Sequence, residues 1–230
     1  MLHEPTPVAA LDRPPALSRL LAGTAVGVAL TGPVAIGLLR GVLPYDTVDE
    51  PLVLVEKIMA APGAQTLVLW LAYLALLTLP LGVGMAGWLA VRSRPVLGAV
   101  AAVLSWLGFL SLFASHGVDA TALAAAGAGV PAETVVALET AAAAIPVLAL
   151  PGLVFVVGHI LGAVLLAVAL RGVIPTWAAV ALGVSQPLHL VFVVLLPNHV
   201  LDAVAWSLTG VGFAAAAAVL VRRSPSVVTA

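Results

Sequence analysis

Long apolar runs, separated by short polar segments, make up most of this chain of 230 residues. The runs show neither the rhythm of an amphipathic surface helix nor the two-residue alternation of a barrel strand. A run of about 20 apolar residues crosses the hydrocarbon layer of a membrane as one helix. The pattern therefore predicts six membrane spans, at residues 17–39, 66–91, 96–115, 147–170, 176–196 and 203–221.

These spans predict an all-α fold, a polytopic membrane helical bundle with six transmembrane helices. Backbone polar groups cannot stay unpaired in lipid, so each run has to be helical. Composition agrees, because 63% of the residues are hydrophobic and 8% are charged, against about a quarter charged in soluble domains. The expected organisation is a tail at 1–16, the bundle at 17–223 with outer loops at 40–65 and 116–146, and a tail at 224–230.

The charged residues are distributed unevenly between the two ends of such a bundle. If all six spans insert, one end carries Arg13, Arg19, Arg92, Arg94, Arg171, Arg222 and Arg223. Only Arg40 and Lys57 remain for the opposite end. That end holds most of the acidic residues, namely Asp46, Asp49, Glu50, Glu56, Asp119, Glu133, Glu139 and Asp202. Basic connections stay in the cytoplasm, which predicts that both termini are cytoplasmic.

The rest of the composition concerns location and partners. Glu4, Asp12 and four prolines within 1–16 argue against a cleavable signal peptide, so the first span is expected to stay as an anchor. Cysteine is absent, which excludes disulfides and thiolate metal sites. Arg outnumbers Lys eight to one, amid abundant Ala, Gly, Val and Pro. This bias indicates a high-GC bacterium, and hence a multi-pass protein of the bacterial inner (cell) membrane. A net charge of −1 without a basic patch predicts the lipid bilayer as partner and no nucleic acid.

The outer loops contain helical patterns of their own. Thr47 and Glu50 have the spacing of a capping box. Apolar residues at helical intervals follow them, as an interfacial helix would require: Leu52, Val55, Ile58 and Met59. Residues 119–146 predict one or two short helices, broken by glycine and proline between 127 and 131.

An internal repeat is indicated at an offset of about 80 residues. The matched positions are Pro95 with Pro175, Ser105 with Ser185, His116 with His199 and Asp119 with Asp202. These matches predict that spans two and three are duplicated as spans four and five, as in transporters with parallel repeats. The alternative is chance identity in a chain rich in alanine, valine and leucine.

The repeated H-x-x-D strings are candidate metal ligands. Residues three apart share a helix face, so His116 can act with Asp119, and His199 with Asp202. Two imidazoles and two carboxylates suit zinc or an iron-type divalent ion. The alternative is that Asp119 and Asp202 are the N-caps of the helices that follow, with both histidines at the polar membrane interface.

Within the spans, His159 and His189 are candidate ligand-binding residues, because ionisable groups inside a membrane are costly. His189 ends a Ser-Gln-Pro-Leu-His string, the most polar stretch of any span. A kink at its proline would open a pocket lined by Ser185, Gln186 and His189. The alternative is that these side chains make interhelical hydrogen bonds only, each worth about 0.6–2 kcal/mol.

A haem held by His159 and His189 requires both residues at one depth. Counted from the outer face, His159 lies about 12 residues down and His189 about 7, a mismatch of roughly 8 Å at about 1.5 Å per residue. Haem is therefore disfavoured, and the cofactor is unknown.

Glycines in the spans are interpreted as sites of close helix packing: Gly23, Gly27, Gly82, Gly158 and Gly162. Such faces would also permit a homo-oligomer or a membrane partner.

Residues 147–223 contain a Gly-His-x-x-Gly helix, an Arg-x-x-x-Pro-x-Trp-Ala-Ala string from Arg171, and an Asp-x-x-x-Trp helix start at Asp202. In these features the chain resembles uncharacterised six-helix membrane proteins of high-GC bacteria. The resemblance implies a fold and a location, and it assigns no activity and no binding residue. The leading hypothesis is a non-enzymatic carrier, accessory or packing component. The alternative is a metal- or haem-binding enzyme or redox protein.

Overall fold

The computed structural model describes residues 15–223. Within that range, six helices are long and apolar enough to cross a membrane: Leu20–Val42, Pro62–Ser93, Pro95–Ala128, Pro146–Ala169, Thr176–Leu195 and His199–Arg222. The predicted all-α bundle is confirmed. The predicted spans begin and end within a few residues of these helices, except that the third helix continues beyond residue 115. Arg13 lies outside the described residues.

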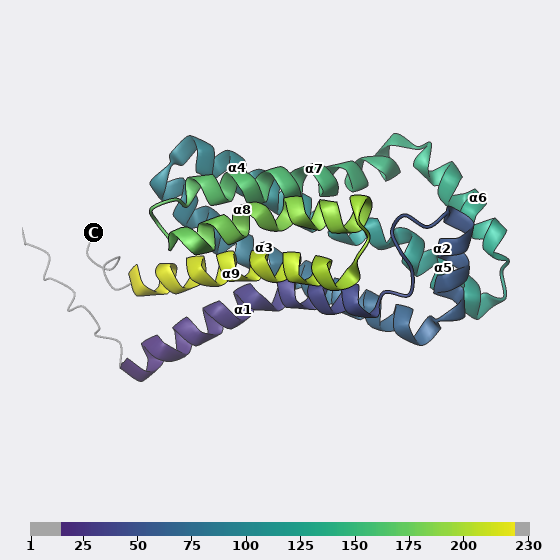
Figure 1. Cartoon of the computed structure of the whole chain (residues 1–230), viewed down its shortest axis with the longest axis horizontal. Helices are drawn as coiled ribbons and strands as arrows, with labels where there is room; N and C mark the ends of the chain where they lie inside the picture. Colours follow the sequence, from purple (N-terminus) through teal and green to yellow (C-terminus); the bar gives the residue numbers. More distant parts are fainter. Residues whose placement is uncertain (1–14, 224–230) are drawn as a thin grey trace, which may run out of the picture.

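The six long helices form a ring in chain order, each antiparallel to the next (Figure 1). They are α1 (Pro15–Val42), α3 (Pro62–Ser93), α4 (Pro95–Leu110), α7 (Pro146–Ala169), α8 (Thr176–Leu190) and α9 (His199–Arg223). Helix α9 packs against α1 and closes the ring, and it also contacts α3 across the middle. Residues 15 and 223 lie at the same end of the bundle.

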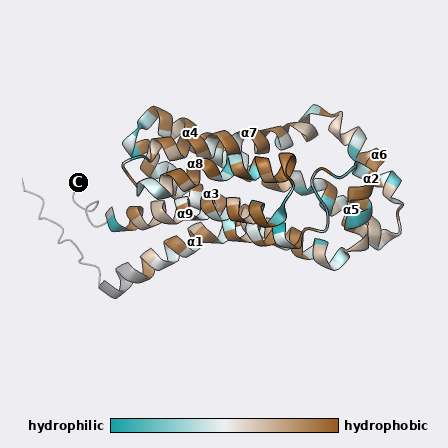
Figure 2. Cartoon of the chain, in the orientation of Figure 1, coloured by the Kyte–Doolittle hydropathy of each residue, from teal (hydrophilic) through white to brown (hydrophobic). Residues whose placement is uncertain are grey.

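The opposite end is covered by three short helices, called the cap below. These are α2 (Pro51–Ala60), α5 (Gly117–Ala128) and α6 (Ala132–Ala143). Helix α2 packs on α5 and α6 and buries Val55 and Ile58 between them. Figure 2 shows teal, hydrophilic residues gathered at both ends, with brown, hydrophobic residues along the bundle. The polar ends and the apolar middle are what a membrane-spanning bundle requires.

The helices predicted in both outer loops are present, but the predicted capping box is wrong. Glu50 precedes α2 and makes no side-chain cap hydrogen bond. The Asp49 carboxylate accepts instead from the Asp46 backbone N–H at 2.8 Å and from Lys57 Nζ at 2.7 Å. The break between α5 and α6 falls at Gly129, which adopts a φ of 68° that favours glycine.

Helices α4 and α8 both end in a non-α turn. A 3₁₀ turn, η1 (Ser111–His116), follows α4, and a π-helical turn, η2 (Val191–Leu195), follows α8. The two turns begin 80 residues apart, at the offset of the repeat. One H-x-x-D string begins at the last residue of η1, and the other begins four residues after η2 ends. The parallel supports the duplication, which stays a prediction.

Glycines bring α4 and α7 into backbone contact. An added Cβ at Gly158 would lie 2.8 Å from Gly108 Cα and 2.9 Å from Leu104 O. One at Gly162 would lie 2.7 Å from Ser105 Cα. The packing role predicted for both is confirmed, as it is for Gly82, whose Cβ would lie 2.7 Å from the Phe213 ring.

Two other glycines do not pack within the chain. An added Cβ at Gly23 or Gly27 meets nothing within 4 Å, so the predicted role in packing is wrong for contacts within the bundle. That an open glycine face of this kind serves an oligomer stays a prediction.

We expect Gly158→Ala to lower the free energy of unfolding by about 1–3 kcal/mol, because a methyl group cannot fit against rigid backbone. The matched control is Gly84→Ala in α3, where an added Cβ meets nothing within 4 Å. Thermal unfolding of both variants in detergent measures the difference. Equal midpoints would mean that α4 and α7 are not packed as closely as described.

Candidate ligand-binding cavity

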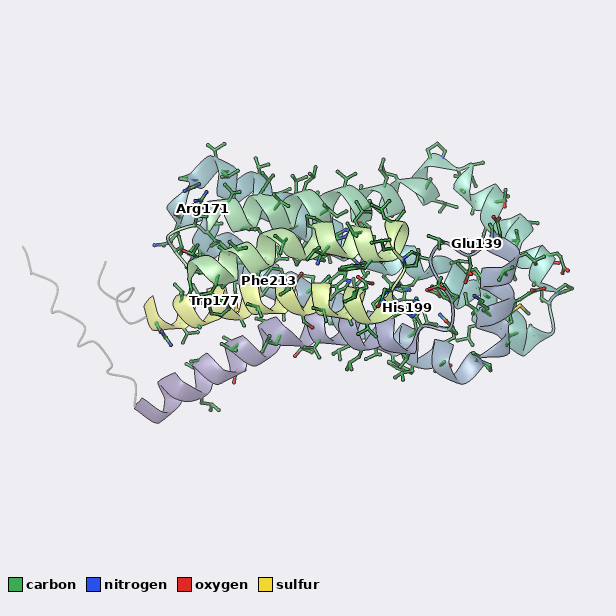
Figure 3. The ribbon with its side chains drawn as sticks, viewed as in Figure 1. Glu139, Arg171, Trp177, His199 and Phe213 are labelled. Carbon is green, nitrogen blue, oxygen red and sulfur yellow. The ribbon has the colours of Figure 1, made fainter. Side chains whose placement is uncertain are left out.

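A cavity of about 420 Å³ lies inside the ring at its cap end. Its walls come from α1, η1, α7, α8 with η2, and α9, close to the start of α9 that His199 marks in Figure 3. The polar and aromatic residues that line it are Arg40, Tyr45, Thr47, His116, Phe155, His159, His189 and Trp206. Its volume falls in the usual range for small-molecule sites, roughly 300–1,000 Å³.

The carboxylate of Asp202 is the centre of one polar cluster in the wall. Asp202 is fully buried, and it forms an ion pair with Arg40 of α1. Its Oδ1 lies 2.5 Å from Nδ1 of His189 on α8. The same Nδ1 also lies 3.1 Å from Nε1 of Trp206, so the imidazole is held between the carboxylate and the indole N–H. The carboxylate therefore joins three helices and orients one imidazole.

The predicted pairing of Asp202 with His199 does not occur. Nε2 of His199 lies 3.0 Å from Asp46 Oδ1, in the loop after α1. Asp202 is not an N-cap either, because Asn198 takes that role and accepts from the Leu201 backbone N–H at 3.0 Å. The spacing of three residues predicted that His199 and Asp202 share one face of α9. In the structure His199 reaches the loop after α1, whereas Asp202 faces the bundle interior.

Asp119 is the centre of a second cluster, at the cap side of the cavity. It is fully buried, accepts from the Tyr45 hydroxyl at 2.6 Å, and lies 2.5 Å from Nδ1 of His116. Burial raises the pKa of the Tyr45 phenol well above its ordinary value, and the neighbouring Asp119 charge raises it further. Tyr45 therefore remains a hydrogen-bond donor. Asp119 lies in the first turn of α5 without capping it.

The four residues predicted as metal ligands thus belong to separate pairs. Among residues 15–223, no group of three or more His, Asp or Glu side chains has a geometry that could hold a metal ion. His116 with Asp119 is the one pair that the structure makes as the spacing predicts. The metal site has no support from this arrangement.

His159 lies beside His189, with ring centroids 5.5 Å apart. The predicted depth mismatch of roughly 8 Å is wrong, because α7 continues further toward the cap than α8 does, so counting from the helix ends compared different levels (Figure 1). The His159 ring stacks on Phe155 at 4.2 Å, and its Nε2 is buried without a hydrogen-bond partner. A haem iron needs that nitrogen to face an open space, so the residues do not fit a bis-histidine haem.

Ser185 and Gln186 lie outside the cavity wall, in a hydrogen-bond chain between α8 and α9. Gln186 Nε2 donates to Thr209 Oγ1 at 2.7 Å, and Thr209 donates to Ser185 Oγ at 2.8 Å. Helix α8 continues through Pro187 to Leu190, and the departure from α-geometry comes only at η2. Of the pocket residues predicted from sequence, His159 and His189 line the cavity and these two do not.

Several cavity residues were missed by sequence reasoning. Tyr45 belongs to no motif, and the motifs that contain Thr47 and Trp206 did not indicate a cavity, since these residues meet the others only in the folded chain. Arg40 carried a usable signal, because it is one of two basic residues at the acidic end of the bundle. A cation that departs from the charge bias at a span end is expected to have a buried carboxylate partner.

Removing one partner of the buried pair Arg40 and Asp202 should lower the free energy of unfolding more than removing both partners does. We expect Asp202→Asn to lower the free energy of unfolding by about 3–5 kcal/mol, because Arg40 is left as an unpaired buried charge. Arg40→Met combined with Asp202→Asn should cost less than the sum of the two single changes. Denaturant unfolding in detergent gives the coupling, and strictly additive losses would contradict the pairing.

The half-buried pair Asp49 and Lys57, outside the bundle, provides the control for these single and double substitutions. Lys57 Nζ lies 2.7 Å from Asp49 Oδ2 in the loop and α2, where solvent screens the charges. Asp49→Asn and Lys57→Met are expected to change stability little and to show weak coupling.

The chemistry of the cavity is therefore that of two imidazoles held on buried carboxylates beside an arginine. Such a site offers hydrogen bonds to a small molecule within a membrane-spanning bundle. No protein-family model, curated protein or solved structure matches this chain.

Proposed function

We propose that this chain is a non-enzymatic carrier of a bacterial inner membrane, which binds a small molecule in the cavity at the cap end. The observation that carries the proposal is the cavity itself, a hollow of about 420 Å³ whose polar groups are fixed by buried ion pairs. A protein that only packs against partners has no need of such a hollow, because membrane helices pack best without voids.

The cavity is closed toward the opposite end of the bundle. Phe109, Trp206 and Phe213 are buried, with Phe109 centred 6.0 Å from Trp206 and 6.1 Å from Phe213. Thr47 lines the cavity and is exposed at the cap end. This arrangement supports loading within the half of the bundle nearest the cap, with the aromatic residues as the inner barrier of a carrier.

The charge distribution supports an orientation with the cap outside the cell. Arg92, Arg94, Arg171 and Arg222 lie at the end opposite the cap, where the connections between helices are short. Basic residues in short connections are retained in the cytoplasm. Both ends of the described chain are then cytoplasmic.

Cysteine labelling tests this orientation in a chain that has no cysteine of its own. We expect a membrane-impermeant thiol reagent to label Glu133→Cys, in α6 of the cap, on intact cells. Ser93→Cys, at the end of α3, should be labelled only after the membrane is opened. The reverse pattern would overturn the orientation.

Retention of a bound small molecule tests the carrier. Val194→Trp places a large side chain in the cavity wall, whereas Val184→Trp puts the same side chain on an exposed face of α8 outside it. We expect native mass spectrometry of protein purified in mild detergent to show a stoichiometric small molecule in the unmodified chain and in Val184→Trp. Val194→Trp should lose it. Equal retention in both variants, or none in the unmodified chain, would favour an accessory or packing role.

A further inference from the structure

The cavity opens sideways, toward the lipid, between α7 and η2. Three exposed aliphatic residues form its wall there, Val156 on α7 with Leu190 and Val194 at the end of α8 and in η2. In the described chain, η2 packs on α8 and α9 and makes no substantial contact with α7. An opening with this lining admits an apolar chain from the membrane more readily than a water-soluble molecule.

The inner wall offers hydrogen bonds from two imidazoles of fixed orientation. His116 and His189 each use Nδ1 on a carboxylate, Asp119 and Asp202 respectively, at 2.5 Å. For each ring, Nε2 is the nitrogen left without a protein partner. A carboxylate on one ring nitrogen fixes where the other points, as it does for histidines that bind ligands.

The charges of the wall favour a neutral ligand. Arg40 Nε forms an ion pair with Asp202, and the two terminal nitrogens of Arg40 lie 3.5 Å from the Thr47 hydroxyl, so the positive charge is balanced within the wall. Asp119 is a second buried carboxylate beside the cavity, which disfavours a ligand that carries a phosphate or carboxylate.

The remaining walls suit a flat ring. Phe155 and Trp206 line the cavity with their aromatic side chains, on either side of His159. Aromatic rings stack favourably on such surfaces, with centroids about 4.5–7 Å apart.

We infer that the ligand is a quinone or its quinol, a neutral ring with oxygen atoms for His116 and His189 and an apolar tail that leaves between α7 and η2. The inference deepens the proposed carrier function and rests on it. An imidazole that donates suits the carbonyl oxygen of the quinone, and an imidazole that accepts suits the hydroxyl of the quinol.

Fluorescence of Trp206 tests the inference directly, since the other four tryptophans are exposed. Replacing Trp70, Trp88, Trp106 and Trp177 by Phe leaves Trp206 as the reporter in the cavity wall. We expect a decyl-tailed benzoquinone to quench it saturably, and decyl phosphate not to compete. A chain that retains only Trp177, at the opposite end, should show linear quenching from free quinone in the detergent.

Histidine variants then identify the site. His116→Gln should weaken the quinone affinity by roughly tenfold, the usual effect of one lost hydrogen bond. His199→Gln, which does not line the cavity, should leave it unchanged. Circular dichroism and the unfolding midpoint check that each variant is folded. Val194→Phe, which fills the cavity without adding a tryptophan and keeps both histidines, should abolish saturable quenching.

The outcomes separate the ligand class from the carrier function. Saturable quenching that His116→Gln weakens and Val194→Phe abolishes supports the quinone. Linear quenching of Trp206, or equal competition by decyl phosphate, overturns it. If the unmodified chain still retains a small molecule that Val194→Trp loses, the carrier stands with another ligand. If no molecule is retained either, both proposals fall.

Discussion

The buried carboxylate of Asp202 constrains the rest of the bundle. A charge in a membrane interior is tolerated only with a counter-charge and hydrogen bonds around it. Asp202 receives them from Arg40 on α1 and His189 on α8, so the rotation of three helices about their axes is fixed by one residue. These three helices, α1, α8 and α9, each form part of the cavity wall. The orientation of the His189 ring, and with it the direction of its Nε2, is therefore fixed as well.

Asp119 is a second buried carboxylate that fixes its neighbours, at the cap end of the bundle. It holds Tyr45, in the loop after α1, and His116, at the end of η1. The two carboxylates come from different helices and bind different partners, so the wall of the cavity is attached on two sides independently. Membrane helices lack a hydrophobic drive toward one another, and specific polar contacts therefore weigh more in positioning them.

The fold could be predicted from sequence because membrane thickness translates directly into the length of an apolar run. The polar partners could not, since pairing depends on which way each helix faces. His116 and Asp119 meet as their spacing predicts, but Asp202 finds His189, 13 residues earlier and on another helix. The depth of His159 failed for a related reason, because helices of unequal length do not share a common end.

The two turns at the cap end explain why the cavity opens where it does. Helix α4 stays against α7 through backbone contact at Gly108 and Gly158, and the tight η1 turn follows it. Helix α8 ends in the wider π-helical η2, whose contacts are with α8 and α9. Turns of this kind are frequent at functional sites because they displace the backbone without ending the hydrogen-bonded path. If the two hairpins are a repeat, the turn after α4 is tight in one copy and the turn after α8 is wide in the other. The opening then lies on the side of α7 that faces η2, and the side that faces α4 stays closed.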